Sequence, residues 1–180
     1  MRIISGKFKG RNLVAPPEGT RPTADRAKEM LFDMLSSLLM KGEKRWENLR
    51  FADVFAGSGA VGLEAASRGV KAVFLFENNT QAQKTIRQNG KGMVFTLYGD
   101  ALALPLILEP MDILFMDPPY GKGLAEQALP QFLKQNWIDE NTLVIVEEDK
   151  KNAFEIPKGF ILTEKRSSGR NTFYFLQKED

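Results

Sequence analysis

The sequence has 180 residues and a formal net charge of +2, with 43% hydrophobic and 27% charged residues, as in an ordinary single globular domain. It contains no cysteine and no histidine, which excludes disulfides, thiolate or imidazole metal ligands and imidazole acid–base catalysis. No apolar run approaches the roughly 20 residues of a membrane span, and the N-terminus lacks the apolar core of a signal peptide. The expected location is therefore the cytoplasm.

Positive charge is concentrated at the N-terminus, where residues 1–28 carry seven Lys and Arg side chains against two acidic ones. Residues 2–14 are predicted to form two short β segments around a glycine-bearing turn, packed loosely on the body. We expect residues 1–22 to form a small basic β-hairpin arm that meets a polyanionic partner. A charged segment that only keeps the chain soluble is the alternative. The candidate phosphate-binding residues are Arg2, Lys7, Lys9, Arg11, Arg21 and Arg26.

After the arm, an amphipathic helix is predicted, because Thr23 is a candidate N-cap and Met and Leu then recur at helical spacing as far as Leu38. Strands and helices then alternate along the chain. Strands are predicted at 51–55, 72–76, 94–97, 112–116 and 142–146, and helices at 63–67, 80–89, 101–108 and 124–134. Two further strands, 160–164 and 172–176, have no helix between them.

This order predicts an α/β fold for residues 23–180. Strand–helix alternation implies right-handed crossovers, which give a parallel sheet with helices on both faces. The final hairpin should add an antiparallel strand. The expected architecture is a Rossmann-like, mostly parallel sheet of seven strands, preceded by the N-terminal β-hairpin arm.

A glycine loop follows the first strand of this sheet. The segment 57–62 reads G-x-G-x-x-G, a pattern that lets backbone approach a ligand and alone also suits a dinucleotide. Asp53, four residues before Gly57, instead suits a ligand with a cationic group, such as the ammonium of an amino acid. Glu77 and Asp100 end the next two strands, placed to meet ribose hydroxyls and an adenine amino group. Switch-point geometry brings these residues to one crevice.

A second motif, Asp117-Pro118-Pro119-Tyr120, follows an apolar strand. The prolines end that strand because they remove N–H donors and fix φ. A carboxylate, backbone carbonyls and an aromatic ring then lie within four residues. This ledge is suited to gripping a flat molecule with an amino group on its edge, although a strand that simply ends in a proline turn has the same residues.

The motifs described so far resemble, in their order along the chain, the motif series of class I S-adenosylmethionine-dependent methyltransferases. They are the segment 53–59, Glu77, the pair 99–100 and the segment 117–120. The D-P-P-Y member resembles the subset that methylates exocyclic nitrogens of bases. Segments 2–10 and 21–32 are similar to the RsmD family of bacterial 16S rRNA guanine-N2 methyltransferases. The resemblance spans nearly the whole chain. It implies S-adenosylmethionine as cofactor and 16S rRNA as partner, either naked or within a small-subunit particle.

The resemblance also implies roles for individual residues. The Asp117 carboxylate and the Pro118 carbonyl would accept hydrogen bonds from the target amino group, while Tyr120 stacks on the base. No metal and no membrane contact are expected, and a monomer is the expected state. The implied cofactor-binding residues are Asp53, Phe55, Gly57, Gly59, Glu77, Asn78, Asp100, Ala101 and Asp117.

Other functions stay open at this point. A DNA adenine-N6 or protein glutamine-N5 methyltransferase would share the ledge, although protein enzymes of that type typically have Asn at the position of Asp117. An NAD-dependent oxidoreductase would share the glycine loop but leaves Asp53, the ledge and the basic arm unexplained. A catalytically silent RNA-binding module is the non-enzymatic alternative. Arg170 in the last loop is a weaker candidate for RNA contact, and guanine N2 as the target rests on the resemblance alone.

Overall fold

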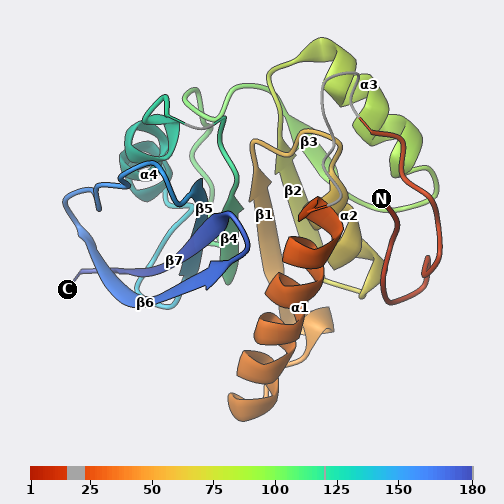
Figure 1. Cartoon of the computed structure of the whole chain (residues 1–180), viewed down its shortest axis with the longest axis horizontal. Helices are drawn as coiled ribbons and strands as arrows, with labels where there is room; N and C mark the ends of the chain where they lie inside the picture. Colours follow the sequence, from red (N-terminus) through yellow and green to blue (C-terminus); the bar gives the residue numbers. More distant parts are fainter. Residues whose placement is uncertain (16–22, 120, 180) are drawn as a thin grey trace.

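The computed structural model describes residues 1–15, 23–119 and 121–179 (Figure 1). Its elements in chain order are α1 (Thr23–Lys41), the 3-10 turn η1 (Trp46–Asn48), β1 (Arg50–Val54), α2 (Ala60–Ser67), β2 (Ala72–Phe76), α3 (Thr80–Asn89), β3 (Thr96–Tyr98), β4 (Ile113–Met116), α4 (Leu124–Lys134), β5 (Leu143–Asp149), β6 (Phe160–Ser168) and β7 (Asn171–Lys178).

All seven strands form one sheet in the order β3-β2-β1-β4-β5-β7-β6. The first five in this order pair in parallel, whereas β7 pairs antiparallel with both β5 and β6. The predicted fold class is confirmed. Parallel pairing also aligns the strand ends, since Val54 of β1 lies beside Met116 of β4, which in turn lies beside Val146 of β5.

Helices cover both faces of the sheet, which explains why the central strands are continuous apolar runs. On one face, α1, α2 and α3 pack on odd-numbered residues of the central strands such as Phe51 and Phe115. On the other face, α4 packs on even-numbered residues such as Leu114, together with Phe132 and Trp137. Figure 1 shows the first three helices apart from α4, with the carboxyl ends of the central strands between them.

The helix predicted at 101–108 is wrong, because this segment consists of turns and irregular backbone. Pro105 lacks the N–H that an interior helical residue donates. Other contacts hold the segment instead. The Trp137 indole N–H donates to the Pro105 carbonyl at 2.8 Å and the Asn136 amide donates to the Ile107 carbonyl at 2.9 Å.

The expected hairpin of the arm is reduced to a single antiparallel bridge between Arg2 and Asn12, and the expectation of loose packing is wrong. Ile3 and Leu13 are buried in a small cluster with Leu63 of α2. The buried Glu64 carboxylate accepts the N–H groups of Ile4 and Ser5 at 2.7 and 3.0 Å. The Ile3 and Leu13 N–H groups donate to the Arg11 and Met1 carbonyls, both at 2.9 Å, so the two segments bind each other, and the α2 carboxylate satisfies the next two N–H groups.

Candidate active-site cleft

The carboxyl ends of β1, β2 and β4 open onto a cleft of about 450 Å³. Seven predicted site residues line it, so the topology brings together most of the residues that the motifs singled out. These are Phe55, Gly57, Glu77, Asn78, Asp100, Asp117 and Pro118. The lining also includes Pro119 of the predicted ledge, together with Leu102 and Leu124, which carry no polar side chain that could have marked them in the sequence.

The glycine loop enters the cleft through an unusual backbone. Phe55, a non-glycine residue, has a φ of 63°, and Gly57 has a φ of 55°, so strain is stored where β1 ends. A Cβ added to Gly57 would meet nothing within 4 Å, whereas one added to Gly62 would lie 2.9 Å from Leu75. The first glycine therefore exposes backbone to a ligand, and the last allows close packing of α2 on the sheet.

Glu77 connects the glycine loop to the start of α3. One carboxylate oxygen accepts the Gly57 N–H at 2.8 Å, and the other accepts the Asn79 N–H at 2.8 Å. Each oxygen keeps further acceptor capacity, so the carboxylate can also meet the hydroxyl groups of a ligand. Asp100, farther along the cleft, accepts the Leu102 N–H at 2.8 Å.

Asp53 lies behind the loop rather than in the cleft wall. Its side chain is buried, and its carboxylate accepts the Gly62 N–H at 2.7 Å. Burial raises the pKa of Asp53 to about 7; the Gly62 hydrogen bond opposes the rise, and the charges of Asp117 and Glu77 add to it. Gly59 and Ala101 are likewise buried behind the lining.

The ledge begins where Asp117 leaves β4, with its N–H donating to the Val54 carbonyl at 3.3 Å. The Asp117 side chain faces solvent in the cleft, whereas Pro118 is buried. Desolvation by the surrounding protein, together with the charge of Glu148, raises the pKa of Asp117. Solvent that still reaches this carboxylate offsets part of the rise. Tyr120 lies outside the described residues.

Two carboxylates of β5 stand beside the ledge, and motif analysis missed them. Glu147 and Glu148 are both buried. Glu147 accepts a hydrogen bond from the Asn171 amide, and burial followed by the charge of Asp117 raises the pKa of Glu147 to about 8. The available signal was position, because both residues come at the carboxyl end of a strand that pairs with β4.

The predicted phosphate-binding residues are spread over the surface: the Lys7 N–H donates to the Ser67 carbonyl at the end of α2 that lies away from the glycine loop, and Arg26 belongs to α1. Arg2, Lys7, Lys9 and Arg26 are exposed, and Arg21 lies outside the described residues. Arg11 donates to the carbonyls of Lys91 and Asn89 at 2.6 and 3.3 Å and lies 4.3 Å from the centre of the Phe8 ring. The guanidinium of Arg11 therefore holds the arm on the end of α3.

Charge indicates which ligand the cleft suits. Its described lining holds three carboxylates and no Lys or Arg, with Asp53 directly behind. The pyrophosphate of NAD would bring negative charge against these groups, whereas S-adenosylmethionine carries a sulfonium and an ammonium. The residues therefore fit S-adenosylmethionine and disfavour NAD. Within the described ranges no group of three or more acidic or other ligating residues could hold a metal ion, and no helix is long and apolar enough to cross a bilayer.

Comparison with known proteins agrees with this geometry. The family model described as Conserved hypothetical protein 95 matches residues 1–177. Ribosomal RNA small subunit methyltransferase D of Haemophilus influenzae is 33% identical over 179 residues, covering 94% of this chain and 89% of the relative. The protein of the same name from Escherichia coli K12 is 30% identical over 186 residues, covering 99% and 90%.

Solved structures extend the likeness to the whole fold. The structure of yhhF from Escherichia coli has a TM-score of 0.81 and 28% identity, covering 100% of this chain and 98% of that one. A hypothetical protein of Thermus thermophilus has a TM-score of 0.76 and 29% identity, covering 98% and 99%. The chain therefore belongs to the family described as Conserved hypothetical protein 95, which is the RsmD family indicated by its N-terminal segments.

Proposed function

We propose that this protein transfers a methyl group from S-adenosylmethionine to the exocyclic N2 amino group of a guanine in 16S rRNA. The observation that carries the proposal is the single cleft in which Glu77, Asp100 and Asp117 meet beside the glycine loop. The relatives named as small-subunit rRNA methyltransferases support RNA as the substrate. We place the protein in the cytoplasm with its RNA and propose that it acts as a monomer.

The described residues divide between the two substrates. Glu77 would hold the ribose of the cofactor, Asp100 its adenine, and the Gly57 backbone its methionine end, with Asp53 behind. When bound, S-adenosylmethionine supplies a methyl group that its sulfonium activates. The acidic cleft favours that cation and excludes anionic ligands.

The ledge acts on the target amine. A guanine amino group is a poor nucleophile because its lone pair is delocalised into the ring. Hydrogen bonds from its N–H groups to the Asp117 carboxylate and the Pro118 carbonyl favour a pyramidal nitrogen and stabilise the positive charge that grows there. Holding both substrates in line accounts for up to about 7–11 kcal/mol of the barrier. From the sequence alone, Tyr120 is proposed to stack on the base, which is worth roughly 1–3 kcal/mol.

The first test removes the carboxylate of the ledge. We expect Asp117→Ala to lower kcat by about 100-fold or more, because a group that stabilises transition-state charge is lost, while S-adenosylmethionine affinity stays within a few-fold. Labelled methyl transfer measures the rate and titration calorimetry measures the affinity. Glu140→Ala is the control, since Glu140 is exposed and precedes β5 at the other end of the sheet. Near wild-type turnover in Asp117→Ala would show that the ledge does not hold the amine.

The second test identifies the acceptor. The protein is incubated with labelled S-adenosylmethionine and ribosomal RNA, DNA or bulk protein, and the products are digested to nucleosides or amino acids. We expect N2-methylguanosine from RNA. N6-methyladenine from DNA or methylated glutamine from protein would instead support one of the alternatives that share the ledge.

A further inference from the structure

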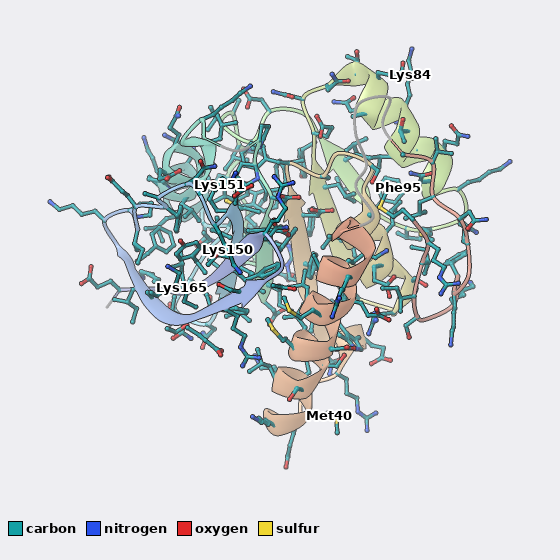
Figure 2. All side chains as sticks on the ribbon, in the orientation of Figure 1. Met40, Lys84, Phe95, Lys150, Lys151 and Lys165 are labelled. Atoms are coloured by element: carbon teal, nitrogen blue, oxygen red, sulfur yellow. The ribbon has the colours of Figure 1, made fainter. Side chains whose placement is uncertain are left out.

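Three cations gather where β5 ends and the β6–β7 hairpin turns. We name Lys150, Lys151 and Arg170 the hairpin patch. All three are exposed, and the Lys150 N–H donates to the Arg170 carbonyl at 2.8 Å, which joins the two segments. Figure 2 labels Lys150 and Lys151 in the part of the molecule where β5, β6 and β7 lie. None of these residues belongs to the basic arm.

The hairpin patch lies close to the ledge. Met116 and Val146 are register partners in neighbouring parallel strands, so Asp117, which follows β4, and Glu147, which is still inside β5, come at the same end of the sheet. Asn171, next to Arg170, binds Glu147. On the other side of Lys151, the Asn152 amide binds Glu148 at 2.9 Å and lies 3.9 Å from where a Cβ of Gly121 would stand. The residues on either side of the patch therefore lie close to Asp117 at one end of the ledge and to Gly121 just after it.

The exposed side chains of this surface are cationic, because the neighbouring carboxylates of β5 are buried. Glu147 and Glu148 are bound by asparagine amides as described above. Asp149 accepts the Lys151 N–H at 3.0 Å and pairs with the Arg170 guanidinium at 3.5 Å. The Asp149 carboxylate thus partly offsets the charge of the Arg170 guanidinium, and the side chains of Lys150 and Lys151 remain exposed to solvent at the turn after β5.

The arm and the hairpin patch lie on opposite sides of the cleft (Figure 1). On the β1 side, Val14 of the arm and Ser58 of the glycine loop are both hydrogen-bonded to Asn89. On the β5 side lies the hairpin patch. A base that enters the cleft must leave its stack, which costs a few kcal/mol. Holding the backbone on both flanks of that nucleotide keeps it in place, and Lys and Arg do this through phosphate contacts.

We propose that the hairpin patch is a second phosphate-binding surface, which holds the RNA backbone on the far side of the target nucleotide from the arm. This inference rests on the proposed function. The partner is RNA rather than an acidic protein because the patch lies beside a ledge that grips an amino-bearing base, within reach of that nucleotide's own phosphates.

The test replaces the three cations together, as Lys150→Gln, Lys151→Gln and Arg170→Gln. Binding of a 16S rRNA fragment is measured at several salt concentrations, alongside S-adenosylmethionine affinity and kcat at saturating RNA. With about 0.7 counterions released per phosphate contact, we expect the slope of log K against log salt to fall in magnitude by about 1.5–2. RNA affinity at physiological salt should fall about tenfold and kcat should fall with it, because the nucleotide is held less firmly, while S-adenosylmethionine affinity should stay within about twofold.

A matched triple variant controls for net charge. It replaces three exposed lysines at the end of the sheet opposite the cleft: Lys41 ends α1, Lys44 follows it, and Lys71 precedes β2. The triple Gln variant at these positions should keep the wild-type slope. An unchanged slope in the hairpin-patch variant, or equal losses in both variants, would overturn the inference. So would weaker binding to a small-subunit particle with unchanged binding to naked RNA, which would indicate a protein contact. Wild-type protein that methylates no RNA would overturn the proposed function itself, and this inference with it.

Discussion

The buried carboxyl group of Asp53 is expected to make the stability of the protein depend on pH. Its pKa is about 7 in the folded protein against 3.8 as the ordinary value. Between these values the folded state keeps a proton that the unfolded state has lost, so stability falls as pH rises from about 4 to about 7 and is level above that. The fall attributable to Asp53 is on the order of a few kcal/mol.

Asp53→Asn should therefore flatten this dependence. We expect the variant to lose less unfolding free energy than the wild type between pH 5 and pH 7.5, as measured by urea denaturation. Glu147 and Asp117 change stability in the same direction, so the slope should shrink rather than vanish. The comparison variant is Asp33→Asn, because Asp33 is exposed on α1. Identical pH slopes in wild type and Asp53→Asn would mean that the native carboxyl is already ionised in this range.

Residue positions in the site were predictable where strand order alone decides them. Glu77, Asp100 and Asp117 each follow a strand, and parallel strands end at one edge. Glu147 obeys the same rule but was missed, because its relation to Asp117 depends on β5 pairing next to β4. The spacing of residues along the chain does not show which strands become neighbours in the sheet.

At the scale of elements, apolar runs marked the central strands reliably because their burial on both faces leaves few alternatives, whereas the edge strand predicted at 94–97 is found at Thr96–Tyr98. The segment 101–108 failed because its backbone is satisfied by side chains of residues 136 and 137, far along the chain. The prediction that the arm packs loosely was wrong for the same reason, because a side chain distant in sequence binds its backbone. Glu64 looks like a solvated helical residue in sequence, yet it is fully buried.

Glu64 is expected to hold the arm on α2. Its carboxylate accepts the N–H groups of Ile4 and Ser5 and pairs with Arg68 at 2.8 Å. Glu64→Gln turns part of that acceptor into a donor facing donors, so unfolding free energy should drop by about 3 kcal/mol. Urea unfolding gives the value, with the exposed Glu47→Gln as control. Equal midpoints in the two variants would show that arm docking does not depend on this carboxylate.

At the scale of the whole molecule, an acidic cleft lies between the N-terminal arm and the hairpin patch. This arrangement separates the two substrates by charge, because the cationic cofactor is favoured inside and the polyanion is favoured around the rim. The burial of Ile3 and Leu13 adds a constraint. Deleting residues 1–14 would expose the apolar cluster on α2, so RNA binding by the arm is better tested through its exposed charges than by truncation.

The arm and the glycine loop are joined through Asn89, which is buried at the end of α3. Its amide donates to the carbonyls of Val14 and Ser58, both at 3.0 Å, and its oxygen accepts the Val14 N–H at 2.8 Å. The segment that ends the arm and the loop that faces the cofactor are thus fixed to the same side chain. A change in the position of either segment should therefore change the position of the other.

Asn89→Ala leaves these three backbone groups without their partner, so we expect unfolding free energy to fall by about 2–3 kcal/mol. If Asn89 also positions both segments, the affinities for S-adenosylmethionine and for RNA should each weaken several-fold under conditions where the variant is fully folded. Gln88→Ala, at the neighbouring exposed position of α3, should change neither. A destabilised variant with both affinities unchanged would assign Asn89 to folding alone, whereas loss of one affinity without the other would show that the arm and the loop move independently.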